Sequence, residues 1–275
     1  MDKIRVASVQ YAYKPITGFN DFVVDIEKLL KKARGADFVV FPETFTMELE
    51  YIITDFALPK LNDYTEDYIK IFTQFALDYN QFIIAGSHLT LEGDKLYNIA
   101  HLFTPGGEIY KHRKTHLFPL EAKTGVSPGE RIEVIETEKA KLGIITCYEM
   151  EFPEIARLLA LKGAEVVFCP SFTVGEHALY RVKYCCQARA VENQVYIVLS
   201  SLVGAGTLKE LEGWGSSAIM SPCEDPWPPN GIIAEAELNK EQVITGELDL
   251  KLLRRKRKRG AATTLKDRRP ELYDF

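Results

Sequence analysis

The 275-residue sequence predicts a mixed α/β fold built as one domain over residues 1–275. Three observations support this prediction. Apolar runs of strand length alternate with amphipathic helical segments, hairpin signals occupy the middle of the chain, and no linker or fixed-period repeat divides it. The length is sufficient for one large core, so a single domain is favoured over two.

The first part of the chain predicts two strand–helix units, each leading into a buried strand. Apolar residues recur at helical spacing from Asp21 to Arg34, and again up to Tyr79, where Asp63 or Thr65 can cap the helix. The strands between the helices are continuous apolar runs, which indicates burial on both faces. The expected strands are Ile4–Gln10, Ala36–Phe41 and Gln81–Ser87.

The middle of the chain predicts two hairpins, and the rest returns to alternating strands and helices. The hairpins pair 98–103 with 108–111 and 132–136 with 142–146. Helices are expected at 153–162, 180–192 and 250–258, and strands at 164–169, 195–200, 217–220, 231–237 and 242–248.

The β-prone run from Gly143 to Thr146 ends at Cys147, and Pro153 marks a helix start shortly afterwards. A strand-to-helix turn brings a side chain close to helix N–H groups, whose partial positive charge favours a thiolate. Cys147 is therefore a candidate nucleophile. The alternative is a small apolar cysteine in the core, because free cysteine is among the most buried residue types.

Two further polar residues are also expected at strand ends. Hydrolysis of an amide or nitrile through a covalent intermediate needs a nucleophile, a base and a donor for the developing oxyanion. Glu43 is the candidate base and Lys114 the candidate donor. The alternatives are a turn carboxylate for Glu43 and a solvated basic cluster for Lys114.

The motifs around these residues occur in an order that resembles the nitrilase, or carbon–nitrogen hydrolase, superfamily. They are the Phe-Pro-Glu ending at Glu43, the Lys-Thr-His-Leu-Phe-Pro from Lys114 and the Cys-Tyr-Glu from Cys147, with Gln187–Gln194 as a helical signature. The resemblance covers nearly the whole chain. The ending 265–273 and the helix 180–184 look most like a branch often fused to an acetyltransferase-like domain, here expected as a stand-alone member.

This resemblance implies a four-layer αββα sandwich and a catalytic set. Cys147 would attack the carbonyl carbon, Glu43 would act as general base, and Lys114 with the backbone N–H of Tyr148 would hold the oxyanion. Glu121 matches a second glutamate that positions substrate and lysine in family amidases; the alternative is a surface carboxylate. The family also implies a homodimer or larger homo-oligomer whose interface includes the tail at about 250–275.

The expected function is a thiol hydrolase that converts a small amide to a carboxylate and ammonia through a Cys147 thioester. Nitrile hydrolysis, N-carbamoyl hydrolysis and a non-catalytic binding protein remain alternatives. The residues expected to contact substrate are Tyr148, Glu149, Glu151, Phe172 and Thr173, with loops 46–61, 171–179 and 204–214 shaping the pocket.

Glu151 departs from the family pattern, because many members carry an arginine at this position. The exchange disfavours a substrate whose carboxylate needs that arginine and favours a neutral or cationic amide. Alternatively, Glu151 could bond Arg181 or Arg189 as part of the scaffold.

Composition limits the partners and the compartment. The N-terminus lacks an apolar signal-peptide core and no run is long enough to span a membrane, so a cytoplasmic protein is expected. The five cysteines include no C-x-x-C pair, and Pro119 disfavours a helical His112–His116 metal site, so neither metal nor cofactor is expected. Net charge is −5, and only the basic run Arg254–Arg259 favours a nucleic-acid or acidic-partner surface, which we set aside.

Overall fold

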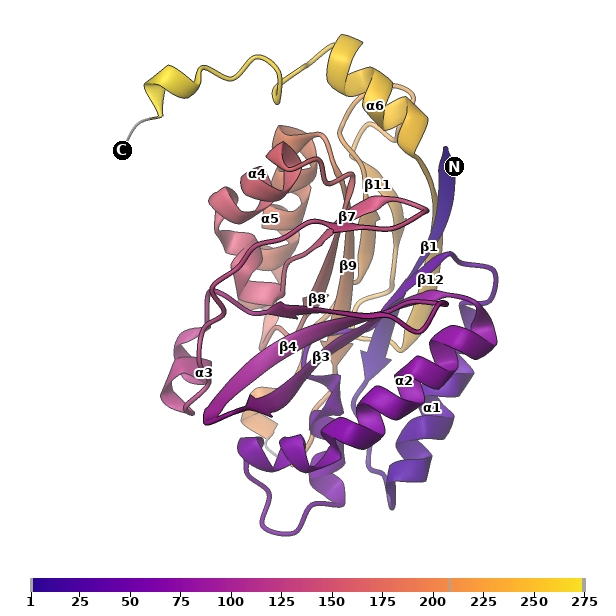
Figure 1. The fold of residues 1–275 in the computed structure, drawn as a ribbon, viewed down its shortest axis with the longest axis vertical. Coiled ribbons are helices and arrows are strands. Elements are labelled where there is room, and N and C mark those ends of the chain that lie inside the picture. Colours follow the sequence, from indigo (N-terminus) through magenta and orange to yellow (C-terminus); the bar gives the residue numbers. More distant parts are fainter. Residues whose placement is uncertain (1, 208, 274–275) are drawn as a thin grey trace.

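The computed structural model describes residues 2–207 and 209–273 as a mixed α/β protein (Figure 1). The strands are β1 (Lys3–Ala12), β2 (Phe38–Val40), β3 (Phe82–Glu92), β4 (Lys95–Phe103), β5 (Ile109–Arg113), β6 (Ile135–Glu136), β7 (Lys141–Ile144), β8 (Val166–Ser171), β9 (Tyr196–Val203), β10 (Ala218–Met220), β11 (Ile232–Glu235) and β12 (Gln242–Asp249). The α-helices are α1 (Phe19–Lys32), α2 (Thr65–Tyr79), α3 (Pro119–Lys123), α4 (Pro153–Leu161), α5 (Glu176–Asn193) and α6 (Leu250–Arg259).

The strands form two sheets that are joined at the end of β1. The order β5-β4-β3-β2-β1 continues through β9-β8-β7-β6, with β12 antiparallel to β1 and β10 antiparallel to β9. Only the end of β1 joins the two halves, where Tyr11 and Ala12 pair with Leu202 and Val203. The first sheet therefore carries the Glu43 and Lys114 segments, and the second carries the Cys147 segment.

Three separate apolar cores define four layers. Helices α1 and α2 pack through Phe22, Ile26 and Phe72 on one face of the first sheet, where Val9 and Val39 point outward. Alternate residues of the same strands enter a second core between the two sheets; this core includes Val6, Val40, Ile84, Ile144, Phe168 and Val198. A third core joins α4 and α5 to the outer face of the second sheet. The predicted αββα sandwich is thus confirmed.

Most predicted elements are present, but their lengths differ. The prediction for the strand from Gln81 was too short, because β3 continues to Glu92 and returns as β4 through the two-residue turn Gly93–Asp94. Gly93 has a φ of +65°, as a tight hairpin turn requires. Helix α5 begins at Glu176, four residues before the predicted start.

The basic run lies in α6, and much of it contacts the chain's own acceptors. Arg254 pairs with Glu165, Lys256 pairs with Glu224, and Arg257 donates to the carbonyls of Ala164 and Gln194. These contacts support a structural role for the run. After α6 the chain continues along the periphery as far as Tyr273 and includes a short 3₁₀ helix, Pro270–Leu272 (Figure 1).

Within residues 2–207 and 209–273, no helix is long and apolar enough to cross a membrane. Over the same residues, no group of three or more His, Cys, Asp or Glu side chains is arranged to hold a metal ion.

Candidate active site

Glu43 follows β2 at a point where β3 must pass very close. A Cβ atom at Gly86 would lie 2.0 Å from the carbonyl oxygen of Pro42, and Gly86 has a φ of +58°. Only glycine meets both demands. The next residue, Ser87, accepts a hydrogen bond from the backbone N–H of Thr44 at 3.0 Å, which fixes the segment that carries Glu43.

Lys114 directly follows β5 and is almost fully buried between two carboxylates. Its Nζ lies 2.7 Å from Oε1 of Glu43 and 2.5 Å from Oε2 of Glu121. Burial alone lowers the pKa of Lys114, but the two carboxylates outweigh it and the pKa is raised. Lys114 is therefore held as an ammonium ion.

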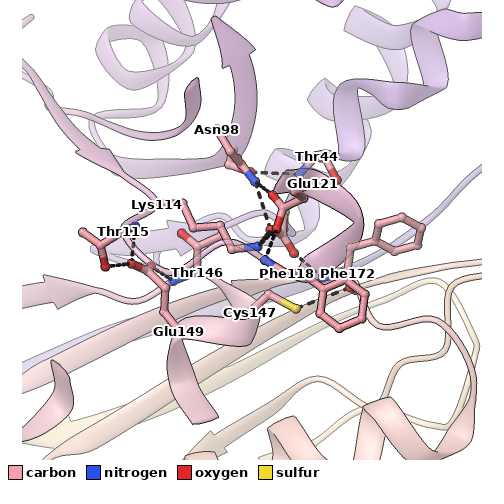
Figure 2. A network of polar contacts seen from close by, with 12 residues as sticks. Thr44, Asn98, Lys114, Thr115, Phe118, Glu121, Thr146, Cys147, Glu149 and Phe172 are labelled. Atoms are coloured by element: carbon pink, nitrogen blue, oxygen red, sulfur yellow. Dashed lines mark hydrogen bonds and ion pairs between the residues drawn. The ribbon is translucent and has the colours of Figure 1, made fainter. Parts of the chain in front are cut away.

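Asn98 on β4 donates to both glutamates, and Figure 2 shows it beside Glu121. Its Nδ2 donates to Oε1 of Glu43 at 3.0 Å and to Oε1 of Glu121 at 2.8 Å. Sequence reasoning missed this residue. The available signal was an amide in an otherwise apolar stretch of strand, since a buried polar side chain needs partners.

Cys147 lies three residues beyond β7, where a 3₁₀ helix, Cys147–Glu151, begins. Its φ of +48° is unusual for a residue with a Cβ atom. The Sγ atom is 3.4 Å from the carbonyl oxygen of Phe172, and the side chain also interacts with Glu43. The candidate nucleophile, base and lysine thus come together in one buried network.

Burial acts against the thiolate that the helix N–H groups were expected to favour at Cys147. Burial, and then the negative charge of Glu43, raise the pKa of the Cys147 thiol well above its ordinary value, and Lys114 offsets this only in part. Burial and the nearby Glu121 also raise the pKa of Glu43, against the opposing effect of Lys114. Cys147 therefore rests as a thiol, and Glu43 is a stronger base than an exposed carboxylate.

Glu149 does not line the cavity, contrary to the prediction that it contacts substrate. It is completely buried, and it accepts hydrogen bonds from Thr115 N, Thr115 Oγ1, Thr146 N and His112 Nε2 at 2.6–2.8 Å. Burial opposes its ionisation, but these donors and the His112 ring lower the pKa of Glu149 to about 2.

Glu149 consequently joins the two segments that carry Lys114 and Cys147 (Figure 2). Thr115 follows Lys114 in the chain and Thr146 precedes Cys147. One buried carboxylate therefore holds the lysine segment of the first sheet against the cysteine segment of the second.

A cavity of about 340 Å³ opens above the thiol. Tyr148, Glu151, Phe172 and Thr173, four of the residues expected to contact substrate, line it. The loops 46–61, 171–179 and 204–214 contribute apolar side chains: Met47, Phe56, Leu58, Val174, Ala178 and Leu211. Among the described residues, its charged lining outside the Glu43, Lys114 and Glu121 cluster is Glu151 and Arg181. An acyl group with an apolar body fits such walls.

A larger groove of about 1220 Å³ runs along β5 and β6. Half of its lining residues are charged, and none of the four candidate catalytic residues lines it. Of Glu149 and its hydrogen-bond partners, His112 reaches this groove. The network around Cys147 opens to the smaller cavity instead.

Comparison with known proteins agrees with this geometry. The family model for carbon–nitrogen hydrolases matches residues 5–258. The chain is 41% identical to a probable hydrolase, YhcX, of Bacillus subtilis over 98% of its own length, and it spans only 54% of that protein. It is 35% identical to a nitrilase of Pyrococcus abyssi, with 90% of each chain covered.

An omega-amidase, NIT2 of Xenopus tropicalis, is 30% identical over 92% of this chain and 91% of its own. Among solved structures, Saccharomyces cerevisiae Nit3, a member of the nitrilase superfamily, superposes with a TM-score of 0.79 at 27% identity, with 97% of each chain covered. The chain therefore belongs to the carbon–nitrogen hydrolase family, within the nitrilase superfamily that its motifs resemble.

Proposed function

We propose that the protein hydrolyses a small amide to a carboxylate and ammonia through a thioester on Cys147. One observation carries this proposal: the Cys147 thiol, the Glu43 carboxylate and the Lys114 ammonium form one buried network at the end of an apolar cavity. Each of the three groups that covalent amide hydrolysis requires is present there.

In the first step, Cys147 Sγ attacks the amide carbon while Glu43 takes the thiol proton. Because the pKa of the thiol is raised, proton transfer has to accompany the attack. The carbonyl oxygen becomes negative, and Lys114 Nζ with the Tyr148 backbone N–H stabilises it. Each such donor is worth about 3 kcal/mol of barrier, by the measured effect of deleting oxyanion-hole donors.

In the second step, the protonated Glu43 gives its proton to the departing nitrogen, and ammonia leaves behind a Cys147 thioester. Glu43 then takes a proton from water, which attacks the thioester carbon. The Cys147 sulfur leaves the carbon and takes the proton back from Glu43, and the product acid leaves and gives its own proton to solvent. Glu43 acts as base and then as acid in each half of the reaction, and its raised pKa suits that alternation.

Glu121 and Asn98 position these groups. Glu121 Oε2 accepts from Lys114 Nζ and, at 2.9 Å, from the backbone N–H of Phe118, so it aims the ammonium ion. Asn98 spans Glu43 and Glu121 and keeps them apart at fixed orientation. Their role is to hold Lys114 and Glu43 where the oxyanion and the proton will be.

The intact set and the family membership favour catalysis over a non-catalytic binding role. A nitrile could use the same thiol, and that activity is the second candidate, supported by the similarity to the Pyrococcus nitrilase. N-carbamoyl amino acids carry a carboxylate next to the reacting group. The apolar lining does not favour them.

Ammonia release from an amide, a nitrile and an N-carbamoyl amino acid tests the proposal. We expect turnover of the amide, loss of turnover in Cys147→Ala, and no change in Cys223→Ala, which removes an exposed thiol outside the cavity. Equal ammonia release by wild type and Cys147→Ala would refute the mechanism. Turnover of the nitrile alone would support the second candidate.

We further infer a cytoplasmic homo-oligomer whose interface includes the tail. All five cysteines are free, which suits a reducing compartment. The apolar tail residues Leu272 and Tyr273 each expose at least half of their surface, and Tyr184 on α5 is also exposed. Light scattering should give a dimer or larger for the full chain, and a smaller species when the chain is truncated after Arg259. A monomeric full chain would contradict the inference.

A further inference from the structure

Two oppositely charged residues lie on the wall of an otherwise apolar cavity. Glu151 ends the 3₁₀ helix that begins at Cys147, and Arg181 lies on α5. Arg181 Nε donates to both carboxylate oxygens of Glu151, at 3.2 and 3.3 Å. The scaffold contact foreseen for Glu151 therefore exists, and it is made inside the cavity.

The pair is held asymmetrically. The Glu151 side chain is 21% exposed and its backbone carbonyl accepts from Arg189 at 3.2 Å, whereas the Arg181 side chain is 49% exposed. Arg181 uses Nε for Glu151, and within residues 2–207 and 209–273 its two terminal amino groups have no protein partner. A guanidinium offers a fork of N–H donors suited to a carboxylate.

The negative charge of Glu151 offsets the positive charge of these free Arg181 amino groups. A substrate carboxylate bound to the free amino groups would gain the attraction of Arg181 but would lie near the negative charge of Glu151. A substrate ammonium near Glu151 would meet the converse penalty from Arg181. An uncharged acyl group meets neither penalty, and the surrounding walls are apolar.

We propose that Glu151 and Arg181 form a specificity pair that selects amides with an uncharged, apolar acyl group. Glu151 cancels the carboxylate-binding capacity of Arg181, and Arg181 cancels the cation-binding capacity of Glu151. The inference rests on the proposed amide hydrolysis and adds the substrate class. Neither residue touches the reacting bond.

Three probe amides of equal chain length test the pair: hexanamide (neutral), adipamate (anionic) and 6-aminohexanamide (cationic). Wild type should show the highest kcat/KM for hexanamide. Glu151→Gln should raise kcat/KM for adipamate about tenfold, because Arg181 can then pair with the substrate carboxylate. Arg181→Gln should raise kcat/KM for 6-aminohexanamide about tenfold, because Glu151 can then pair with the substrate ammonium. Each figure corresponds to one partly exposed ion pair. The double variant should lose both gains.

Hexanamide serves as the internal reference: for each variant, the kcat/KM of each charged amide is divided by the kcat/KM of hexanamide measured with the same protein. Glu247→Gln is the matched control. This substitution breaks an exposed ion pair with Lys3, and Glu247 does not line the cavity. It should leave all three values unchanged. A wild type that prefers adipamate or 6-aminohexanamide, or single variants that shift all three substrates equally, would overturn the proposal.

Binding separates this inference from the proposed function. In a Cys147→Ala background, calorimetric titration should show the same dependence on charge: Glu151→Gln should lower the Kd for adipamate, and Arg181→Gln should lower the Kd for 6-aminohexanamide. If wild type turned over none of them while the Kd pattern appeared, amide hydrolysis would fail and the specificity pair would stand. If turnover occurred but the charge variants left Kd and kcat/KM unchanged, only the pair would fail.

Discussion

Replacing Glu149 by Gln should cost both stability and activity. Gln keeps the shape of the side chain but turns one acceptor oxygen into a donor. If the new NH₂ group occupies the Oε2 position, the backbone N–H of Thr146 loses its acceptor; if it occupies the Oε1 position, that of Thr115 does. A buried donor left unpaired costs about 1–3 kcal/mol.

The acidity of Glu149 gives a second route to the magnitude. Its pKa falls from an ordinary 4.5 to about 2 in the folded protein. At about 1.4 kcal/mol per pKa unit, this corresponds to about 3 kcal/mol of folding free energy, in line with the hydrogen-bond figure. Because the folded pKa is depressed, this contribution is present above pH 4.5 and is lost as pH falls toward 2.

The activity should fall because Glu149 ties the Lys114 segment to the Cys147 segment. A displacement of about 1 Å between such groups costs about 10²-fold in rate. We therefore expect Glu149→Gln to lower the unfolding free energy by about 3 kcal/mol at pH 7 and to lower kcat by about 10–100-fold. Urea denaturation and steady-state ammonia release measure the two effects.

Glu165→Gln is the matched control, since Glu165 is another buried carboxylate that accepts from Arg254 and from the backbone N–H of Lys141. It lies outside the cavity lining. This variant should lose stability but keep kcat. Glu149→Gln with wild-type kcat, or with a stability change below about 0.5 kcal/mol at pH 7, would refute the positioning role.

Three further variants test other parts of the structure. Asn98→Leu should lower kcat about tenfold and raise the pKa of Glu43 further, because the carboxylate loses a donor; an unshifted acid limb of the pH–rate profile would contradict this. Gly86→Ala should destabilise the protein by about 2–4 kcal/mol in urea denaturation, since its Cβ atom would meet Pro42; a neutral result would count against the close approach. Burial raises the pKa of Glu48 to about 8 despite the opposing effects of Tyr11 and Lys14, so the folded protein loses stability as pH rises from 4.5 toward 8. Glu48→Gln should remove that loss, and identical pH–stability curves for the variant and wild type would contradict it.

Contiguous motifs made much of the site predictable. Glu43, Lys114 and Cys147 each sit just beyond a strand, and the structure brings them together with Glu121. The alternation of apolar runs and amphipathic helices likewise indicated the layers, because it records which faces are buried. These features are local in sequence, so local reasoning reached them.

The features that were missed depend on long-range pairing and burial. Asn98 and Glu43 are 55 residues apart in the sequence, and Asn98 reaches Glu43 only because β4 pairs with β3. The role of Glu149 likewise depends on two segments that meet in space. The raised pKa of Cys147 follows from burial beside a carboxylate, which no local pattern reports.

A covalent acyl–Cys147 intermediate is the most direct evidence for the proposed mechanism. Acid quenching of the wild-type protein during turnover of hexanamide should trap this thioester, because acid stops its hydrolysis. Intact-protein mass spectrometry should then show the mass of one hexanoyl group, and peptide mapping should place it on Cys147. The adduct should be absent from Cys147→Ala, and also from Glu43→Gln, which lacks the base for the attack on the amide. An adduct that persists in Cys147→Ala, or one that peptide mapping places on another residue, would contradict the mechanism.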